Sequence, residues 1–281
     1  MINNILTLDV LICTINKRIE DLKDFKFIYN KNVNYIISYQ CTINKTSNMF
    51  DVLKYLNTIK NVQVVEHNSV GLSKNRNLAI KHAKSDICLF CDDDIILRDN
   101  FYDIIIEEYN NIDNADLIAF RLNEKENKKL FRKYNNFNEK YKKFTSFTRA
   151  QVCSPEITFN RKRFPDLKFN ENFGLGSKVT GGEEAILINN MLKMKKNIFH
   201  SKKVIGLLND VTHSGNRRNK EYLYSLGITF TCVHKYFAIV HILKFILGEI
   251  IRQRRVIHPL MYLKPILSGH IRCCIDKCKV C

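Results

Sequence analysis

The sequence predicts an α/β fold with a mostly parallel, doubly wound sheet flanked by helices, followed by a helical extension at the C-terminus. Short apolar runs alternate with segments of helical spacing four times before residue 92, and this alternation is typical of a parallel sheet. The 281 residues are 45% hydrophobic and 26% charged, which is ordinary for a globular protein and excludes a disordered one. A chain of this length can bury an ample core in one large domain or two small ones.

The predicted elements follow one another along the chain. Short apolar runs predict buried strands at residues 9–15, 33–38, 62–66, 87–91 and 117–121. Apolar residues three and four apart predict helices at 20–25, 51–59, 73–83 and 101–109. Residues 144–159 look strand-like, whereas 124–143, rich in Lys, Asn and Glu, predict a surface loop. The aromatic residues of that loop either anchor it to the body or stack on a ligand: Phe131, Tyr134, Phe137 and Tyr141.

The chain is strongly basic. Its formal net charge of +17 favours an anionic partner, such as nucleic acid, a phosphorylated ligand or an acidic membrane surface. No signal peptide is expected, because Asp9 interrupts the apolar run 5–12, and no run reaches the length that a transmembrane helix needs. The ten cysteines, several of them within apolar runs, resemble small buried hydrophobic residues and indicate a reducing, cytoplasmic setting.

Three consecutive aspartates, Asp92, Asp93 and Asp94, directly follow the predicted strand 87–91. In an extended backbone Asp92 and Asp94 share one direction and Asp93 takes the other. Two carboxylates at the end of a strand repel each other unless a cation lies between them, and Mg²⁺ or Mn²⁺ prefers such oxygen ligands. Ligands of open α/β sheets collect outside the carboxyl ends of the strands, which favours a metal site over a solvated turn or a helix N-cap.

A glycine-punctuated segment, residues 169–182, leads into a helix that is expected to begin near Glu183. Glycines let a loop approach a ligand closely and let it move. Carboxylates in the first turn of a helix are favoured by its dipole. Glu183 and Glu184 are therefore explained either as helix-stabilising residues or as functional groups.

Four motifs follow one another along the chain: Cys13-Thr-Ile-Asn-Lys-Arg, Gly71-Leu-Ser-Lys-Asn-Arg-Asn, Asp92-Asp-Asp and Gly182-Glu-Glu. They are similar to the Pro-Thr-Tyr-Asn-Arg, Gly-x-Ser-x-x-Arg-Asn, Asp-x-Asp and Gly-Glu-Asp patterns of family 2 glycosyltransferases, which have the GT-A fold. The resemblance covers about residues 9–218. It implies a Rossmann-like GT-A catalytic domain at residues 1–220 and a basic helical extension at 221–281.

The resemblance also implies roles for individual residues. The donor nucleotide would be held by residues after the first two strands, at the start of the helix after Gly71 and in the acidic motif: Thr14, Asn16, Arg18, Gln40, Ser73, Arg76, Asn77, Asp92 and Asp93. Asp92 and Asp94 would bind Mn²⁺ or Mg²⁺, a Lewis acid for the leaving diphosphate. Glu184, with Glu183 as the rival, would be the general base for the acceptor hydroxyl, and in-line attack would invert the anomeric configuration.

Two positions depart from the family pattern. Ser38-Tyr-Gln40 stands where the family usually has Asp-Asp-Gly-Ser, whose first acid reads a uracil-like base. The Gln40 amide can still donate to and accept from a base edge, so a uridine donor is favoured only by its frequency in the family. Glu184 stands where aspartate is commoner, and its extra methylene leaves the choice between Glu183 and Glu184 open.

The rest of the chain adds three expectations. His213 is expected as a metal or phosphate ligand and Arg217 as a phosphate clamp, with a solvated loop as the alternative. Residues 236–255 combine apolar positions with a basic stripe, which fits a helix lying on an anionic membrane or one packed on the catalytic domain or a second subunit. The pair Cys278 and Cys281 lacks the second pair of known zinc modules, so ordinary thiols are favoured over a zinc site.

Together these features predict a metal-dependent inverting glycosyltransferase of bacterial surface polysaccharide biosynthesis. Its implied partners are a nucleotide-sugar donor, a glycan or lipid-linked acceptor and an anionic membrane surface, but no nucleic acid. Its implied location is the cytoplasm, peripheral on the inner face of the plasma membrane. The alternatives are a non-catalytic GT-A ligand-binding or scaffold protein and a basic nucleic-acid-binding protein, the latter disfavoured because the basic residues are dispersed and form no recognised motif.

Overall fold

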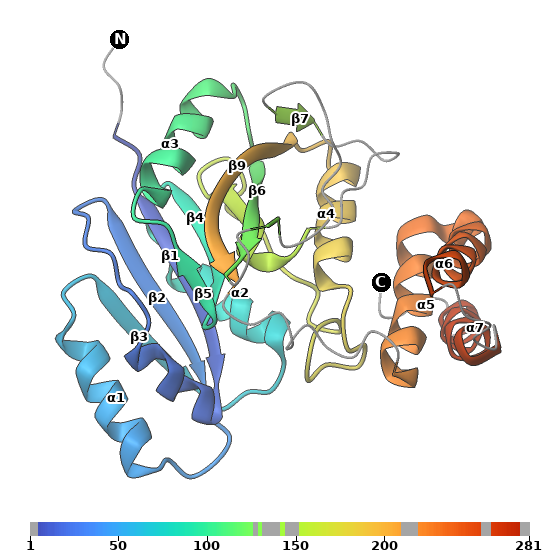
Figure 1. Cartoon of the computed structure of the whole chain (residues 1–281), viewed down its shortest axis with the longest axis horizontal. Coiled ribbons are helices and arrows are strands. Elements are labelled where there is room, and N and C mark those ends of the chain that lie inside the picture. The colour runs from blue at the N-terminus through green and yellow to red at the C-terminus, as the bar shows by residue number, and fades with distance from the viewer. Residues whose placement is uncertain are drawn as a thin grey trace. The chain divides into compact units, whose positions relative to one another are not determined.

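The computed structural model describes residues 5–125, 129–130, 141–143, 152–208, 219–253 and 260–275 (Figure 1). The chain divides into two compact units. Unit 1 contains Met1–Val70, Lys74–Lys168 and Met191–Val211, and unit 2 contains Gly71–Ser73, Phe169–Asn190 and Thr212–Cys281. The glycine-punctuated segment therefore groups with the C-terminal helices in unit 2.

A nine-stranded mixed sheet lies in unit 1, with the order β3-β2-β1-β4-β8-β6-β9-β5 and with β7 paired to β9. The strands are β1 (Leu8–Ile15), β2 (Val33–Gln40), β3 (Val62–His67), β4 (Ile87–Asp92), β5 (Ile95–Leu97), β6 (Leu117–Glu124), β7 (Tyr141–Lys143), β8 (Ile157–Asn160) and β9 (Ile198–Leu208). The first four are parallel to one another, and β6 is parallel to β9. Strands β5, β7 and β8 run antiparallel to their partners. The predicted α/β class is confirmed, and the sheet is parallel in its first half and mixed in its second.

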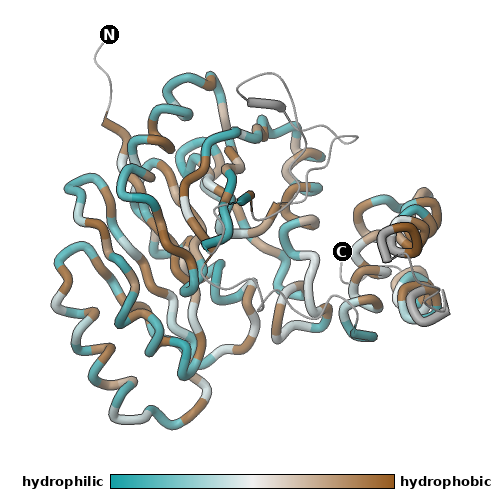
Figure 2. The backbone as a smooth tube through the Cα atoms, in the orientation of Figure 1, coloured by the Kyte–Doolittle hydropathy of each residue, from teal (hydrophilic) through white to brown (hydrophobic). Residues whose placement is uncertain are grey.

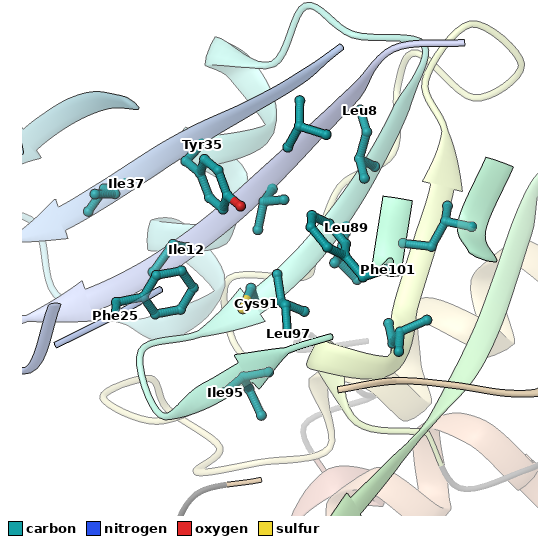
Figure 3. Packing of buried hydrophobic residues seen from close by; sticks show 14 of the residues in the cluster. Leu8, Ile12, Phe25, Tyr35, Ile37, Leu89, Cys91, Ile95, Leu97 and Phe101 are labelled. Atoms are coloured by element: carbon teal, nitrogen blue, oxygen red, sulfur yellow. The ribbon is translucent and has the colours of Figure 1, made fainter. Parts of the chain in front are cut away.

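Side chains that alternate along the parallel strands form the main core of unit 1. Figure 3 shows part of this core, which joins residues of three strands to Phe25 and to helix α3 (Phe101–Asn111): Leu8, Ile12, Tyr35, Ile37, Leu89, Cys91 and Phe101. Helix α1 (Ser47–Thr58) and the 3₁₀ helix η1 (Asn16–Lys23) contribute to the same cluster, so they cover the same face. Each fully buried aliphatic or aromatic side chain contributes about 1.5–3 kcal/mol to the stability of the fold.

The other face of the sheet is buried as well. Leu11, Ile36 and Phe90 alternate with the core residues along their strands and are at most 3% exposed. The Phe90 ring stacks on that of Phe159 in β8, with centroids 5.5 Å apart. Burial on both faces explains why the parallel strands appear in the sequence as nearly continuous apolar runs.

Three sequence expectations for unit 1 are corrected. The helix expected at 20–25 is the 3₁₀ helix η1, which begins directly after β1. The surface loop expected at 124–143 begins with the last residue of β6 and ends with strand β7; Tyr141 lies in β7, whereas Phe131, Tyr134 and Phe137 lie outside the described residues. In the strand-like segment 144–159, the described part forms the short 3₁₀ helix η2 (Ser154–Glu156) and the start of β8.

Unit 2 contains a bundle of three helices, α5 (Lys220–His234), α6 (Ala238–Gln253) and α7 (Leu260–Ile275) (Figure 1). The Asn219 side chain caps α5 by accepting a hydrogen bond from the Tyr222 amide at 2.6 Å. Gly227 lets α5 and α7 approach closely, because a Cβ at this position would lie 2.0 Å from the Ile266 carbonyl oxygen. The predicted C-terminal helical extension is thus present.

By length and composition, the helical stretch Lys220–Gly248 is the one stretch in the described part of the chain that could cross a membrane, which corrects the expectation that no run is long enough. However, 44% of its most apolar window is buried inside the protein. A 3₁₀ turn, Lys235–Phe237, separates α5 from α6, and Lys235 has a φ of +49°. Leu223 of α5 and Ile242 and Ile246 of α6 belong to one buried cluster, so the stretch is two helices packed on each other rather than one straight rod.

Candidate active site

The carboxyl ends of β1 and β4 meet at one edge of the sheet. The two strands are parallel neighbours, and Cys13 pairs with Asp92 in their register. Thr14 therefore lies beside the turn formed by Asp93 and Asp94. This edge is where open α/β sheets bind ligands, as the sequence predicted.

Asp93 turns inward and holds this edge together. Its carboxylate accepts hydrogen bonds from Thr14 Oγ1 at 2.7 Å and from Arg18 Nε at 3.0 Å, and it also contacts Arg18 Nη2. The side chain of Asp93 is only 3% exposed. The hydrogen bond to Asp93 raises the pKa of Arg18 above its ordinary value, so the guanidinium is permanently charged. Asp93 thus joins β1, η1 and the turn after β4.

Asp92 and Asp94 lie on the outer side of the same turn and are half-buried. Asp92 Oδ1 is 3.7 Å from Arg76 Nη2, and Asp94 Oδ2 is 3.9 Å from Arg18 Nη2. These are ion-pair separations, longer than hydrogen bonds. Asp92 and Asp94 are thus on one side and Asp93 on the other, as expected, although the strand ends at Asp92 and the next two residues form a turn. The result is an acidic rim flanked by two guanidinium groups.

The donor set of this rim suits Mg²⁺ or Mn²⁺ that is shared with a ligand. Within the described ranges, no group of three or more His, Cys, Asp or Glu side chains could hold a metal ion by itself. Mg²⁺ is usually held by one or two carboxylates together with phosphate oxygens of a substrate, rather than by a cage made only of protein. Asp92 and Asp94 fit that mode of binding. His213 and Arg217, the other predicted metal and phosphate residues, lie outside the described residues.

Helix α2 (Leu72–His82) carries three of the residues predicted to contact the nucleotide. Arg76 is 3% exposed and lies near Asp92, whereas Asn77 is half-buried. Ser73 is fully buried and donates to the carbonyl oxygen of Phe173 at 2.6 Å, so its hydroxyl is engaged within unit 2.

Sequence reasoning missed Asn75, which supports the end of β1. Its amide nitrogen donates to the Thr14 carbonyl oxygen at 3.1 Å, and its Oδ1 lies 3.0 Å from His67 Nε2. His67 Nδ1 lies 2.8 Å from Ser69 Oγ. The signal available in the sequence was the position of Asn75 between Ser73 and Arg76, inside the motif already recognised.

Gln40 and Asn16 lie at the same edge of the sheet. Gln40 ends β2 and is 2% exposed, and its backbone pairs with Ile15 of β1. Asn16 has a φ of +49°, and its Oδ1 accepts a hydrogen bond from the Thr42 amide at 2.8 Å. Asn16 thereby ties the start of η1 to the segment after β2. The structure brings Thr14, Asn16 and Gln40 to one edge, as predicted, and their contact with a base stays a prediction.

Cys13, next to Thr14, is buried, and burial raises the pKa of its thiol to about 12. A thiol with this pKa stays protonated and unreactive near neutral pH. Cys13 therefore packs as a small hydrophobic residue, as expected from the sequence.

Unit 2 carries the two glutamates at the start of helix α4 (Glu183–Lys193). Gly182 precedes them with a φ of +84°, and a Cβ there would lie 2.3 Å from Thr229 Oγ1 of α5. Only glycine fits this backbone and this close approach. The loop is thus fixed on α5 immediately before the glutamates.

The two glutamates differ in burial. Glu183 is 6% exposed, and its carboxyl carbon would lie 3.5 Å from a Cβ added at Gly174, so its head group packs against the glycine-punctuated segment. Glu184 is half-buried. A general base must reach the hydroxyl of a substrate, and the more exposed Glu184 is better placed for such contact.

Solved structures resemble this fold. TarS 1–349 of S. aureus is 16% identical, with a TM-score of 0.56 over 97% of this chain and 92% of that one. The mannosyltransferase PcManGT of Pyrobaculum calidifontis, solved with GDP-Man and Mn²⁺, is 10% identical, with a TM-score of 0.54 over 94% and 69% of the two chains. TarS 1–349 with UDP-GlcNAc is 17% identical, with a TM-score of 0.51 over 81% and 66%. At such identities the likeness shows the fold, which is that of the GT-A glycosyltransferases.

The sequence profile of glycosyl transferase family 2 matches residues 12–166, more than half of the chain. The chain belongs to this family and is a glycosyltransferase. A comparison with curated proteins finds no significant match.

Proposed function

We propose that this glycosyltransferase is metal-dependent and inverting, and that it moves a sugar from a nucleoside diphosphate to a hydroxyl group of a glycan or lipid-linked acceptor. The observation that carries the proposal is the acidic rim, where Asp92 and Asp94 lie beside Arg76 and Arg18 at the carboxyl edge of the parallel sheet. Two carboxylates could share a cation with the negatively charged diphosphate of the donor, and the two guanidinium groups could bind its oxygens.

The ligands of the structural neighbours support a nucleotide-sugar donor. TarS was solved with UDP-GlcNAc and with UDP, and PcManGT with GDP-Man and Mn²⁺. All three ligands are nucleoside diphosphates or their sugar conjugates. Because the two sugar donors differ in base, and because Gln40 replaces an acid here, both uridine and guanosine donors are candidates.

Different residues would stabilise the leaving diphosphate and activate the acceptor. The metal would act as a Lewis acid that neutralises the leaving diphosphate. Arg18 and Arg76 add fixed positive charge at the same rim, and Asp93 holds Arg18 in place. Glu184 takes the proton from the acceptor hydroxyl. The acceptor oxygen bonds to the anomeric carbon of the donor sugar, and the bond from that carbon to the diphosphate breaks. Attack from the opposite side inverts that carbon.

A thermal-shift screen tests donor binding. We expect one nucleoside diphosphate, from a set that includes UDP and GDP, to raise the melting temperature in Mn²⁺ and to lose most of that effect in EDTA. A ligand present at about 100 times its Kd stabilises the native state by about 2.7 kcal/mol, which is readily measured. Nucleoside monophosphates are the control, since they lack the second phosphate. No metal-dependent shift with any diphosphate would contradict the proposed donor class.

We also propose that α6 attaches the enzyme to an anionic membrane surface. Val240, Leu243, Leu247 and Ile251 fall on one side of the helix at spacings of three and four and are 55–68% exposed. Ile242 and Ile246, on the opposite side, are buried in the bundle. Lys235 and Lys244 are exposed beside this stripe, and the whole chain carries a net charge of +17. An exposed apolar stripe with flanking cations suits the interface of an anionic bilayer. Figure 2 shows hydrophobic stretches on the C-terminal helices, α6 among them.

Liposome flotation tests this attachment. We expect the full chain to float with vesicles that contain phosphatidylglycerol, and the triple variant V240D/L243D/L247D to float about tenfold less, because three apolar contacts are replaced by repelled charges. The matched control is I43D/F50D/Y55D, which makes the same change at exposed apolar residues of unit 1. Equal flotation of both variants would refute the assignment to α6. The assignment would also be refuted if the parent chain did not float with the vesicles and the variant V240D/L243D/L247D converted a dimer into a monomer. That result would show that α6 contacts a second copy of the chain.

A further inference from the structure

A cavity of about 730 Å³ lies within unit 2, between the glycine-punctuated segment and the helices α5 and α7. The residues that line it come from these three parts of the chain: Lys178, Thr180, Lys220, Glu221, Tyr224, Ser225, Lys264, Pro265 and Ser268. A volume of this size is typical of small-molecule sites. All lining residues belong to one compact unit, so the shape of the cavity is a property of that unit alone.

The rim of this cavity is cationic. Lys178, Lys220 and Lys264 are exposed, and they come from three different segments that the fold brings together around one opening. Glu221 is the one acid in the lining. Three like charges around one cavity repel each other, and an anion between them would turn repulsion into attraction. Lysine ammonium groups on flexible stems bind phosphate as point charges.

The N-terminus of α5 lies at this cavity and also favours binding of an anion. Lys220 is the first residue of the helix, where the dipole favours a negative group and disfavours a lysine. Helix stability therefore gives no reason for a cation at this position. A ligand that carries phosphate or carboxylate would be attracted both by the helix terminus and by the lysine.

The floor of the cavity suits a saccharide rather than a bare anion. The ring of half-buried Tyr224 and the ring of Pro265 provide flat apolar surface. Thr180 and Ser225 provide hydroxyl groups, which lie 3.0 Å from each other. Flat apolar surface with a few hydroxyls is the combination that binds a sugar ring, because such rings have an apolar face and polar edges.

The cavity and the proposed base share one short stretch of chain. Thr180 lines the cavity and is fixed by its amide, which donates to Ser225 Oγ at 3.0 Å. Glu184 follows four residues later, so their Cα atoms are at most about 14 Å apart. Thr180 and Gly182 within this stretch both lie against α5, at Ser225 and Thr229. This spacing limits how far the cavity wall at Thr180 can lie from the group proposed to deprotonate the sugar.

We infer that this cavity is the acceptor site, and that it takes a saccharide that bears phosphate or carboxylate. The role of this cavity as the acceptor site rests on the proposed function. The binding of an anionic saccharide in the cavity does not depend on that function. The lysines hold the anionic group, the floor holds the ring, and a ring hydroxyl is left for Glu184.

Isothermal titration of the full chain with glucose 6-phosphate and with glucuronate tests the site, with neutral glucose as the comparison. We expect binding of at least one anionic sugar, and a Kd at least tenfold weaker in the variant K178Q/K220Q/K264Q. The matched control K31Q/K54Q/K60Q removes the same charge from exposed lysines of unit 1 and should change the Kd less than about twofold. The melting temperature of each variant reports whether it is folded.

The outcomes separate the two proposals. Binding of an anionic sugar that depends on the three cavity lysines, without any response to nucleoside diphosphates, would support the site and refute the proposed donor chemistry. Equal weakening in both lysine variants, or equal affinity for glucose, would overturn the site. Binding only to vesicles that contain phosphatidic acid would overturn the saccharide assignment and identify a lipid phosphate as the source of the anion.

Discussion

Replacing Asp94 with asparagine is expected to lower kcat/KM for release of nucleoside diphosphate from the donor by at least about 10²-fold, and the same is expected for Asp92→Asn. Each change removes a charged oxygen ligand from the acidic rim next to Arg18 or Arg76. A Lewis-acid metal contributes several kcal/mol to the stabilisation of developing charge, and each 1.36 kcal/mol corresponds to tenfold in rate. The measurement is the initial rate across a Mn²⁺ titration, with the donor identified by thermal shift.

Asp99→Asn provides a matched control for these variants. The Asp99 side chain is 78% exposed and pairs with Lys26 at the surface, so the same chemical change there should leave the rate within about twofold. Asp93→Asn should behave differently again, because Asp93 is bound inside the protein by Thr14 and Arg18. It should lower the melting temperature. If Asp94→Asn and Asp92→Asn kept the rate and the Mn²⁺ dependence of the parent, the rim would not be the metal site.

The parallel half of the fold was predictable because its signals are local. Strands β1, β2 and β4 are buried on both faces, and their apolar runs appear directly in the sequence. The order of strand and helix then fixes the edge at which the carboxyl ends meet. The position of Asp92 at this edge therefore followed from the sequence before any contact was known.

The second half depends on pairings between distant residues, which no local pattern reveals. Strand β9 was missed because Ser201, Lys202 and Lys203 interrupt its apolar run, although it is the longest strand among the described residues and pairs with β6. Helix α5 was not assigned individually, because Tyr, Ile, Thr, Phe and Val give it much strand propensity. Its packing on α7 at Gly227 is a tertiary contact that overrides this propensity.

The candidate site shows the same limit at the level of single residues. The sequence predicted that Asp93 points away from Asp92 and Asp94, but it did not reveal that the Asp93 side is the inner one, since that depends on hydrogen bonds from Thr14 and Arg18. It likewise marked Ser73 as a nucleotide contact, whereas its hydroxyl is bonded to the Phe173 carbonyl a hundred residues away. Motifs identify which residues gather at a site. Which of them face a ligand is decided by long-range contacts.

Glu184→Gln is expected to lower kcat about 10²–10⁴-fold while leaving the Mn²⁺-dependent thermal shift by nucleoside diphosphate unchanged. Glutamine keeps the size of the side chain and removes the group that accepts the proton, and general base catalysis is typically worth this factor. Glu183→Gln is the internal comparison. Because Glu183 is 6% exposed and packs against Gly174, we expect this change mainly to lower the melting temperature, with a smaller loss of kcat. The reverse pattern would assign the base to Glu183. Full activity of the double variant E183Q/E184Q would show that neither glutamate is the base.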